Sequence, residues 1–224
     1  MTPLPPAPLP RSFDRPARQG RRLRALSALA AAVGLAALAA CSSSPRVQFH
    51  SLMDTAVTAP RPTGTAPFAF RIESPVRVPA QVDQPQMVLR TASGEVRLQE
   101  YQRWVAPLTD EWRDALADGL VRRSGALDAS RVPAPAGLAR FDLRLELQRF
   151  DAVPGGEARQ QVAWSVHEPQ GTRPLMSCLT EVSQPAPTDV PGVVAAQRAA
   201  TQAVATVIAG ALQSLQAGRT PACP

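Results

Sequence analysis

Apolar and polar residues alternate along several short stretches of the chain, which is the pattern of a strand that buries one face. In the clearest stretch, apolar residues at every second position from Phe141 to Leu147 alternate with charged or polar ones from Asp142 to Gln148. Shorter stretches with the same tendency lie at 47–52, 68–72, 86–90, 95–98, 160–167 and 175–182. Short turns with glycine and proline join the last three strands, so they predict an antiparallel meander.

Two other stretches repeat apolar residues every three or four positions, which predicts helices with one buried face. The first begins with Pro107 in its first turn and ends at Ser124-Gly125, where glycine is a common stop. The second follows the proline-rich segment 185–191 and ends near Gly218. Strands, a helix, strands and a helix within one domain predict an α+β fold: a mostly antiparallel sheet with two amphipathic helices packed on one face.

The first forty residues differ from the rest of the chain. Arginines dominate the start, an Ala- and Leu-rich run covers 26–40, and the segment ends in Leu38-Ala39-Ala40-Cys41. A basic region, a short apolar region and small residues before a cysteine are typical of a bacterial secretory signal. The last four residues match a lipobox, the processing site of lipoproteins, so Cys41 is predicted to be the lipidated N-terminus.

Two other interpretations of this segment stay open: an uncleaved membrane anchor, and an ordinary signal peptide followed by an unrelated cysteine. The apolar run is about 15 residues, shorter than the roughly 20 that a spanning helix needs, which favours cleavage. The predicted organisation is a removed signal peptide at 1–40, a lipidated tether at 41–46, one α+β domain at 47–218 and a C-terminal tail at 219–224.

The formal charge of +6 comes mostly from the signal segment, which carries six arginines against Asp14. The remaining chain is nearly neutral, so charge gives no argument for nucleic acid as a partner. Cys178 and Cys223 form an even pair in an oxidising compartment, where disulfides persist. Two free thiols are the alternative, but we favour a bridge because it would tie the C-terminal tail to a predicted strand.

Residue types that carry catalysis or bind metals are not grouped in this sequence. The two histidines, His50 and His167, lie far apart, and neither has a cysteine or carboxylate at metal-ligand spacing. No helix is predicted after Gly155-Gly156, so this pair is a turn rather than a phosphate-binding loop. We therefore expect no catalytic residue, no metal and no cofactor, and a binding role instead.

The candidate partner-binding residues surround the start of the first predicted helix. They are Tyr101, Arg103, Trp104 and Trp112. Polar aromatic residues and arginine are enriched at the centres of protein interfaces. The same residues would also suit the packing of a helix against a sheet, and the sequence favours neither interpretation over the other.

An ordered set of segments carries a family resemblance. It comprises Cys41, Phe49-His50-Ser51-Leu52, the segments 72–79 and 85–88, and the segment 100–108, in which Arg103-Trp104 is followed shortly by Pro107-Leu108. Together these resemble the PqiC (YmbA-like) lipoproteins, auxiliary components of ABC-type mammalian-cell-entry (MCE) transport systems. The resemblance runs from Cys41 to about Leu215. It departs in the first strand, where family members commonly have a Tyr-Tyr-x-Leu-like run.

The resemblance implies a non-enzymatic, membrane-anchored subunit that binds the periplasm-spanning MCE tunnel protein. Such a subunit would support lipid movement between membranes and envelope integrity, and a homo-oligomer at the tunnel end would suit that role. Ser42 after Cys41 implies an outer-membrane, periplasm-facing location by the enteric sorting rule, with the inner membrane as the alternative. The family usually lacks a conserved cysteine pair, so the resemblance gives the bridge no support.

Two other functions compete with this one. A free-standing structural lipoprotein of the envelope would have the same signal and the same fold but no transport partner. A periplasmic enzyme with an unrecognised site is the third hypothesis, and the scattered histidines and carboxylates argue against it.

Overall fold

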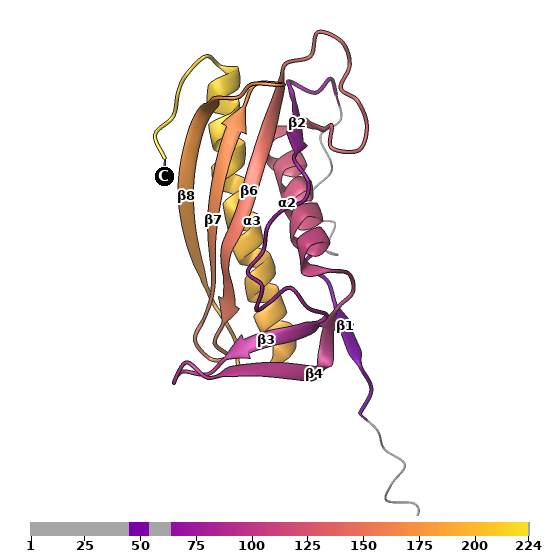
Figure 1. The fold of residues 1–224 in the computed structure, drawn as a ribbon, viewed down its shortest axis with the longest axis vertical. Helices are drawn as coiled ribbons and strands as arrows, with labels where there is room; N and C mark the ends of the chain where they lie inside the picture. The colour runs from indigo at the N-terminus through magenta and orange to yellow at the C-terminus, as the bar shows by residue number, and fades with distance from the viewer. Residues whose placement is uncertain (1–44, 54–63, 224) are drawn as a thin grey trace, which may run out of the picture. The chain divides into compact units, whose positions relative to one another are not determined.

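The alternating stretches form two sheets in the computed structural model, which describes residues 45–53 and 64–223 (Figure 1). The predictions for the signal peptide, Cys41 and most of the tether lie outside these residues. The strands are β1 (Gln48–His50), β2 (Ala69–Ile72), β3 (Gln86–Arg90), β4 (Val96–Trp104), β5 (Leu127–Asp128), β6 (Arg140–Ala152), β7 (Glu157–His167) and β8 (Pro174–Pro185). The helices are α2 (Leu108–Ser124) and α3 (Val190–Gln216).

The larger sheet has five strands in the order β5-β2-β6-β7-β8. Its β6, β7 and β8 are antiparallel neighbours joined by short turns, as the sequence predicts. β2 runs parallel to both β5 and β6. Parallel neighbours need a long crossover, and here the chain between β2 and β5 contains β3, β4 and α2.

The smaller sheet is where the predicted architecture needs correction. Alternation within each strand predicts one sheet, but β1, β4 and β3 form a separate sheet in which β1 is parallel to β4 and β3 is antiparallel to it. The strand predicted at 95–98 is longer in the structure, where β4 continues to Trp104. The smaller sheet lies at one end of the molecule, beside the start of α3 (Figure 1).

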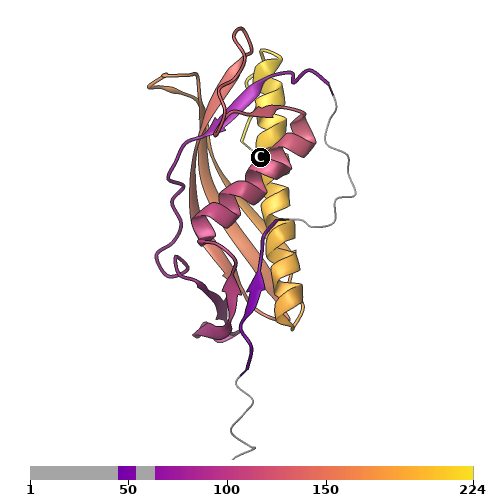
Figure 2. The same cartoon turned by 90° about the vertical axis from the view of Figure 1, so that its right-hand side faces the viewer.

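The two helices begin and end close to the predicted positions. α2 follows Pro107 and stops at Gly125, whose φ of 69° is left-handed and whose N–H donates to the Val121 carbonyl. Glycine adopts this conformation without the steric cost that a Cβ would bring. Figure 2 shows both helices on the same side of the five-stranded sheet, which confirms the α+β arrangement. Neither helix has both the length and the apolar character that crossing a membrane requires.

The core lies between the helices and the five-stranded sheet. Trp112 and Leu116 of α2, Ile208 and Leu212 of α3, and Leu143 of β6 have essentially no exposed surface. The apolar residues that share the predicted helical and strand periodicities are the ones that meet here. Burial of this apolar area is the main favourable free-energy contribution to folding.

A buried group of polar side chains ties both helices to β7. The Gln160 side-chain amide of β7 accepts a hydrogen bond from the Trp112 indole of α2 (3.0 Å). It donates to the side-chain oxygens of Gln197 (2.9 Å) and Thr201 (3.0 Å) of α3. Buried polar groups are costly unless they are hydrogen-bonded. These bonds therefore favour one relative placement of the two helices and the sheet.

The helices approach each other closely at Gly119. A methyl group at this position would lie 2.7 Å from the Cβ of Ala205 and 2.8 Å from the side-chain oxygen of Gln202. Real Cβ atoms do not come so near a neighbouring carbon, so any larger residue would push α2 away from α3. Gly210, in α3, provides a contrast because nothing lies within 4 Å of the same position.

We predict opposite effects of alanine at these two glycines. Gly119→Ala should lower the free energy of unfolding, because overpacking typically costs about 1–3 kcal/mol and exceeds the helix-propensity gain of up to about 1 kcal/mol. Gly210→Ala should raise it by about 0.5–1 kcal/mol, because it receives the propensity gain alone. Chemical denaturation of the two variants and the parent chain measures both effects. Stabilisation by both substitutions would contradict the close helix approach.

The two cysteines that follow Cys41 in the sequence are joined in this structure. Cys178 of β8 and Cys223 of the C-terminal tail form a disulfide, with their Cα atoms 5.5 Å apart. The bond closes a loop of 45 residues in sequence separation that includes the whole of α3. A crosslink of this length restricts the unfolded chain and holds the tail beside β8.

Candidate functional site

Exposed apolar side chains gather on the smaller sheet. The described residues include nine large hydrophobic side chains that are exposed, and six of these belong to β1, β4 or their immediate neighbours. We call this set the end face; it consists of Val47, Phe49, Val96, Leu98, Tyr101 and Val105. Soluble proteins rarely leave apolar side chains grouped in this way unless the group binds something.

The strand register shows why these residues share one side of the sheet. Met87 and Leu89 of β3 are buried and lie opposite Gln99 and Arg97 of β4, so that side of β3 and β4 faces the core. Leu98 lies opposite Val88 and therefore points to the other side. In the parallel pair with β1, buried Trp104 faces the core, and Phe49 and Arg103 therefore point away from it.

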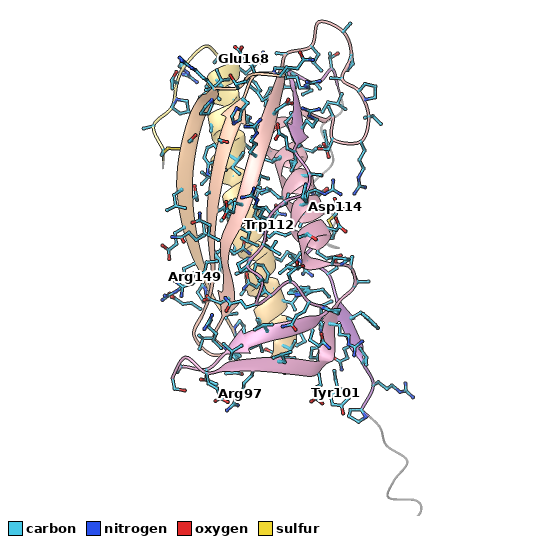
Figure 3. The ribbon with its side chains drawn as sticks, in the orientation of Figure 1. Arg97, Tyr101, Trp112, Asp114, Arg149 and Glu168 are labelled. Carbon is cyan, nitrogen blue, oxygen red and sulfur yellow. A yellow bond between two sulfur atoms is a disulfide. The ribbon has the colours of Figure 1, made fainter. Side chains whose placement is uncertain are left out.

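A bulge in β4 keeps the two halves of the end face together. Leu98 and Tyr101 are an odd number of residues apart, so a regular strand would place them on opposite sides. The pairing with β3 shifts between Gln86 and Met87, whose partners are Arg103 and Gln99. The extra residues of β4 reverse the alternation. Tyr101 thus joins Leu98 on the outer side of the sheet. Figure 3 labels Tyr101 beside β4, at the end of the domain where the smaller sheet lies.

The predicted partner-binding residues separate into two groups. Tyr101 is 43% exposed and belongs to the end face, and Arg103 is half-buried at its margin, opposite Phe49. Trp104 is only 5% exposed and packs edge-to-face against Phe150, with the two ring centroids 6.0 Å apart. Trp112 has no exposed surface and donates to Gln160. The two tryptophans are therefore core residues, which corrects their prediction as direct partner contacts.

Sequence reasoning missed Phe49 and Leu98 as surface residues. Phe49 is 62% exposed and Leu98 is 53% exposed, although both occupy apolar positions of predicted strands. Alternation shows that two residues share a side of a strand, but it does not show which side is covered. No helix or second sheet of the described residues covers this side, and that is a property of the tertiary structure alone.

The segment after β1 is fixed to the helices by buried and partly buried hydrogen bonds. The carboxylate of Glu111 in α2 accepts hydrogen bonds from the Ser51 hydroxyl (2.7 Å) and the Leu52 amide (2.8 Å). Arg198 of α3 donates to the Ser51 carbonyl (2.9 Å). Hydrogen bonds to charged groups are stronger than neutral ones. They hold the start of the domain, and with it the β1 part of the end face, in one position.

A second open surface lies on the side of the five-stranded sheet that the helices do not cover. Gln160 and Val162 of β7 face the helices, so the alternate residues of β6, β7 and β8 face away from them. This helix-free face carries Arg144, Glu146, Ala163, Ser165, Ser177 and Leu179. A groove of about 450 Å³ runs along it, bounded on one side by Glu73, Pro75 and Arg77.

The titratable groups of the described residues form no catalytic arrangement. His50 pairs with Gln102 (2.6 Å) and His167 with Ser165 (2.9 Å). No three His, Cys, Asp or Glu side chains come together as metal ligands within the described part of the chain. The pKa of Glu157 is lowered because Arg159 and Ser183 donate hydrogen bonds to its carboxylate, and the pKa of Arg159 is raised by the same pairing. This exposed pair lies at the start of β7, on the side of the five-stranded sheet that the helices do not cover.

We predict that Glu111→Ala loosens the start of the domain. Removal of the carboxylate leaves the Leu52 amide without its buried acceptor, at a cost of about 1–3 kcal/mol. Hydrogen exchange at 47–53 should become faster, and proteases should cut there sooner. Asp110→Ala is the matched control, because Asp110 is exposed in the same helical turn. Equal exchange rates in the two variants would show that Glu111 does not hold this segment.

A family model described as ABC-type transport auxiliary lipoprotein component matches residues 50–209. No curated protein matches the chain. An uncharacterized protein of known crystal structure superposes with a TM-score of 0.60 at 15% identity, covering 75% of this chain and 99% of its own.

A second solved structure, protein XCC0632 from Xanthomonas campestris, superposes with a TM-score of 0.55 at 19% identity. The match covers 78% of this chain and 94% of that protein. At these identities the two structures establish similarity of fold. They support the α+β architecture over nearly all of the described domain.

Proposed function

The chain belongs to the family of ABC-type transport auxiliary lipoprotein components, and from this membership we propose that it is the lipid-anchored subunit of an MCE-type lipid transport system. The observation that carries the proposal is the family match over 50–209, which spans the domain from β1 to the last turns of α3. In this role the domain binds the periplasm-spanning MCE protein and catalyses no reaction. It supports lipid transport between membranes and the integrity of the envelope.

The proposed anchor is a lipid on Cys41, after removal of residues 1–40. The support is the sequence Leu38-Ala39-Ala40-Cys41 behind a basic and an apolar segment. Anchoring would leave only a few residues between the lipid and β1. Ser42 at the next position favours the outer membrane.

We predict that Cys41→Ser releases the protein from the membrane without unfolding it. The substitution removes the thiol that would carry the lipid, and it lies outside the domain formed by 46–224. Membrane fractionation should find the parent chain in the membrane and the variant in the soluble fraction or retained as uncleaved precursor. Thermal unfolding should be unchanged. A mature variant that stays firmly in the membrane would place the anchor elsewhere.

We propose that the MCE protein contacts the helix-free face. This face combines exposed Leu175 and Leu179 with arginine and glutamate side chains along the groove. Such a mixture of apolar and charged groups is typical of non-obligate protein interfaces. β8 is also the last strand of its sheet, so the part of its outer edge that the C-terminal tail leaves free can pair with an added strand.

We predict that Leu179→Asp weakens this contact. A charge in place of an interfacial leucine should cost about 1–2 kcal/mol of binding, because it must be desolvated. Val132→Asp is the matched control: Val132 is as exposed as Leu179 (54% against 52%) but lies in the loop before β6. Pull-down with the MCE protein measures the difference, and thermal unfolding checks the fold. Equal retention of both variants would exclude this face as the contact.

The competing hypothesis is a free-standing structural lipoprotein of the envelope. It makes the same prediction for Cys41→Ser but expects no partner. A parent chain that is membrane-anchored and folded, yet captures no MCE protein from its own transport system, would favour this alternative.

A further inference from the structure

We propose that the end face is a membrane-contact surface, which seats the domain on the lipid–water interface of its own bilayer. The six side chains of the end face would enter the boundary between headgroups and acyl chains. The inference rests on the proposed function, because it takes the lipid on Cys41 as the anchor. It adds which part of the domain touches lipid and how the domain is oriented.

The first argument is the short length of the tether. Cys41 and Val47 are six positions apart, and six residues span at most about 20 Å when fully extended. Val47 and Phe49 belong to the end face themselves, and hydrogen bonds from Ser51 and Leu52 to Glu111 fix the segment that follows. Among the surfaces of the domain, the end face is therefore the one that an anchored Cys41 holds closest to the bilayer.

The second argument is the chemistry of the surface. Phe49, Leu98 and Val105 each expose more than half of their surface to solvent. Tyr101, at the same end of the molecule (Figure 3), combines an apolar ring with a polar hydroxyl. Apolar residues with amphipathic aromatics are the composition that binds the membrane interface. A domain exposed to water on all sides would be more soluble with polar residues at these positions.

The third argument is charge. The ionic groups near the end face nearly balance, with Arg46, Arg97 and Arg103 against Glu95 and Glu100. Arg97 is also paired with Glu95 at 3.1 Å. Electrostatic attraction to anionic lipid is therefore weak, and the contact should form on zwitterionic lipid through apolar burial.

The test uses the tryptophans of the chain. All three native tryptophans, Trp104, Trp112 and Trp164, are buried. A tryptophan introduced at the surface is therefore the one that lipid can reach. The Phe49→Trp and Tyr101→Trp reporters are made in the full lipidated chain and bound to phosphatidylcholine vesicles, with or without bromine on the acyl chains. Bromine quenches indole emission on contact.

We expect brominated vesicles to reduce the added emission of both reporters and plain vesicles to shift it to shorter wavelength. The Leu179→Trp control, on the helix-free face, should show neither effect. Quenching of this control to the same extent, or no quenching of the end-face reporters in a chain that floats with the vesicles, would overturn the inference. A blue shift that requires the MCE protein and occurs without quenching would assign the end face to that partner and would also overturn it.

A paired variant separates the inference from the proposed function. Phe49→Asp with Leu98→Asp should still float with vesicles through the lipid and still bind the MCE protein. It should, however, abolish bromine quenching of the Tyr101→Trp reporter, and Val132→Asp should leave this quenching intact. Unchanged quenching in the paired variant would overturn the inference alone. A parent chain that does not float would overturn the anchor and the inference together.

Discussion

The hydrogen bonds of Gln160 set which surfaces of this protein remain open. They connect the central part of β7 to Trp112 of α2 and to Gln197 and Thr201 of α3, all within the core. Both helices are thereby placed on one side of the five-stranded sheet, and Gly119 permits their close contact. Among the described residues, no helix or second sheet covers the other side of that sheet or the outer side of the smaller sheet.

These two uncovered surfaces differ in chemistry, and the difference suggests a division of roles. The end face is apolar, carries Tyr101 and lies where the chain enters the domain. The helix-free face is mixed and charged, and its groove lies across the neighbouring strands β6, β7 and β8. A domain held by a lipid on one side and by a protein on another would link a membrane to a transport partner. Glu111 and Arg198 would transmit that mechanical connection, because they hold the segment between tether and core.

The disulfide between Cys178 and Cys223 adds a constraint at the opposite end of α3 from the smaller sheet. It fastens the tail beside β8, the edge strand of the helix-free face. The tail therefore lies next to the outer edge of β8 near Cys178. Any partner strand that pairs with β8 must do so along the portion that the tail leaves free.

The sequence by itself determined both helices and most of the strands, although not β5 or the last residues of β4. Alternation in 141–148 and helical spacing in 108–120 are local properties of the chain, and they show which residues of each element share one face. The lipoprotein family was also visible, because its segments occur in order along the sequence. The sequence did not show which candidate residues are exposed. Tyr101 and Trp104 are both aromatic residues in one short segment, and their local sequence does not distinguish an exposed side chain from a buried one.

Only the tertiary structure decided that Trp104 and Trp112 are buried while Phe49, Leu98 and Tyr101 are exposed. The split into two sheets and the bulge in β4 depend on pairing between strands that are distant in sequence. Periodicity records that one side of a strand is apolar, but burial requires another element to cover that side. For the smaller sheet, nothing in the described domain covers the outer side, and this is why an apolar surface faces outward there.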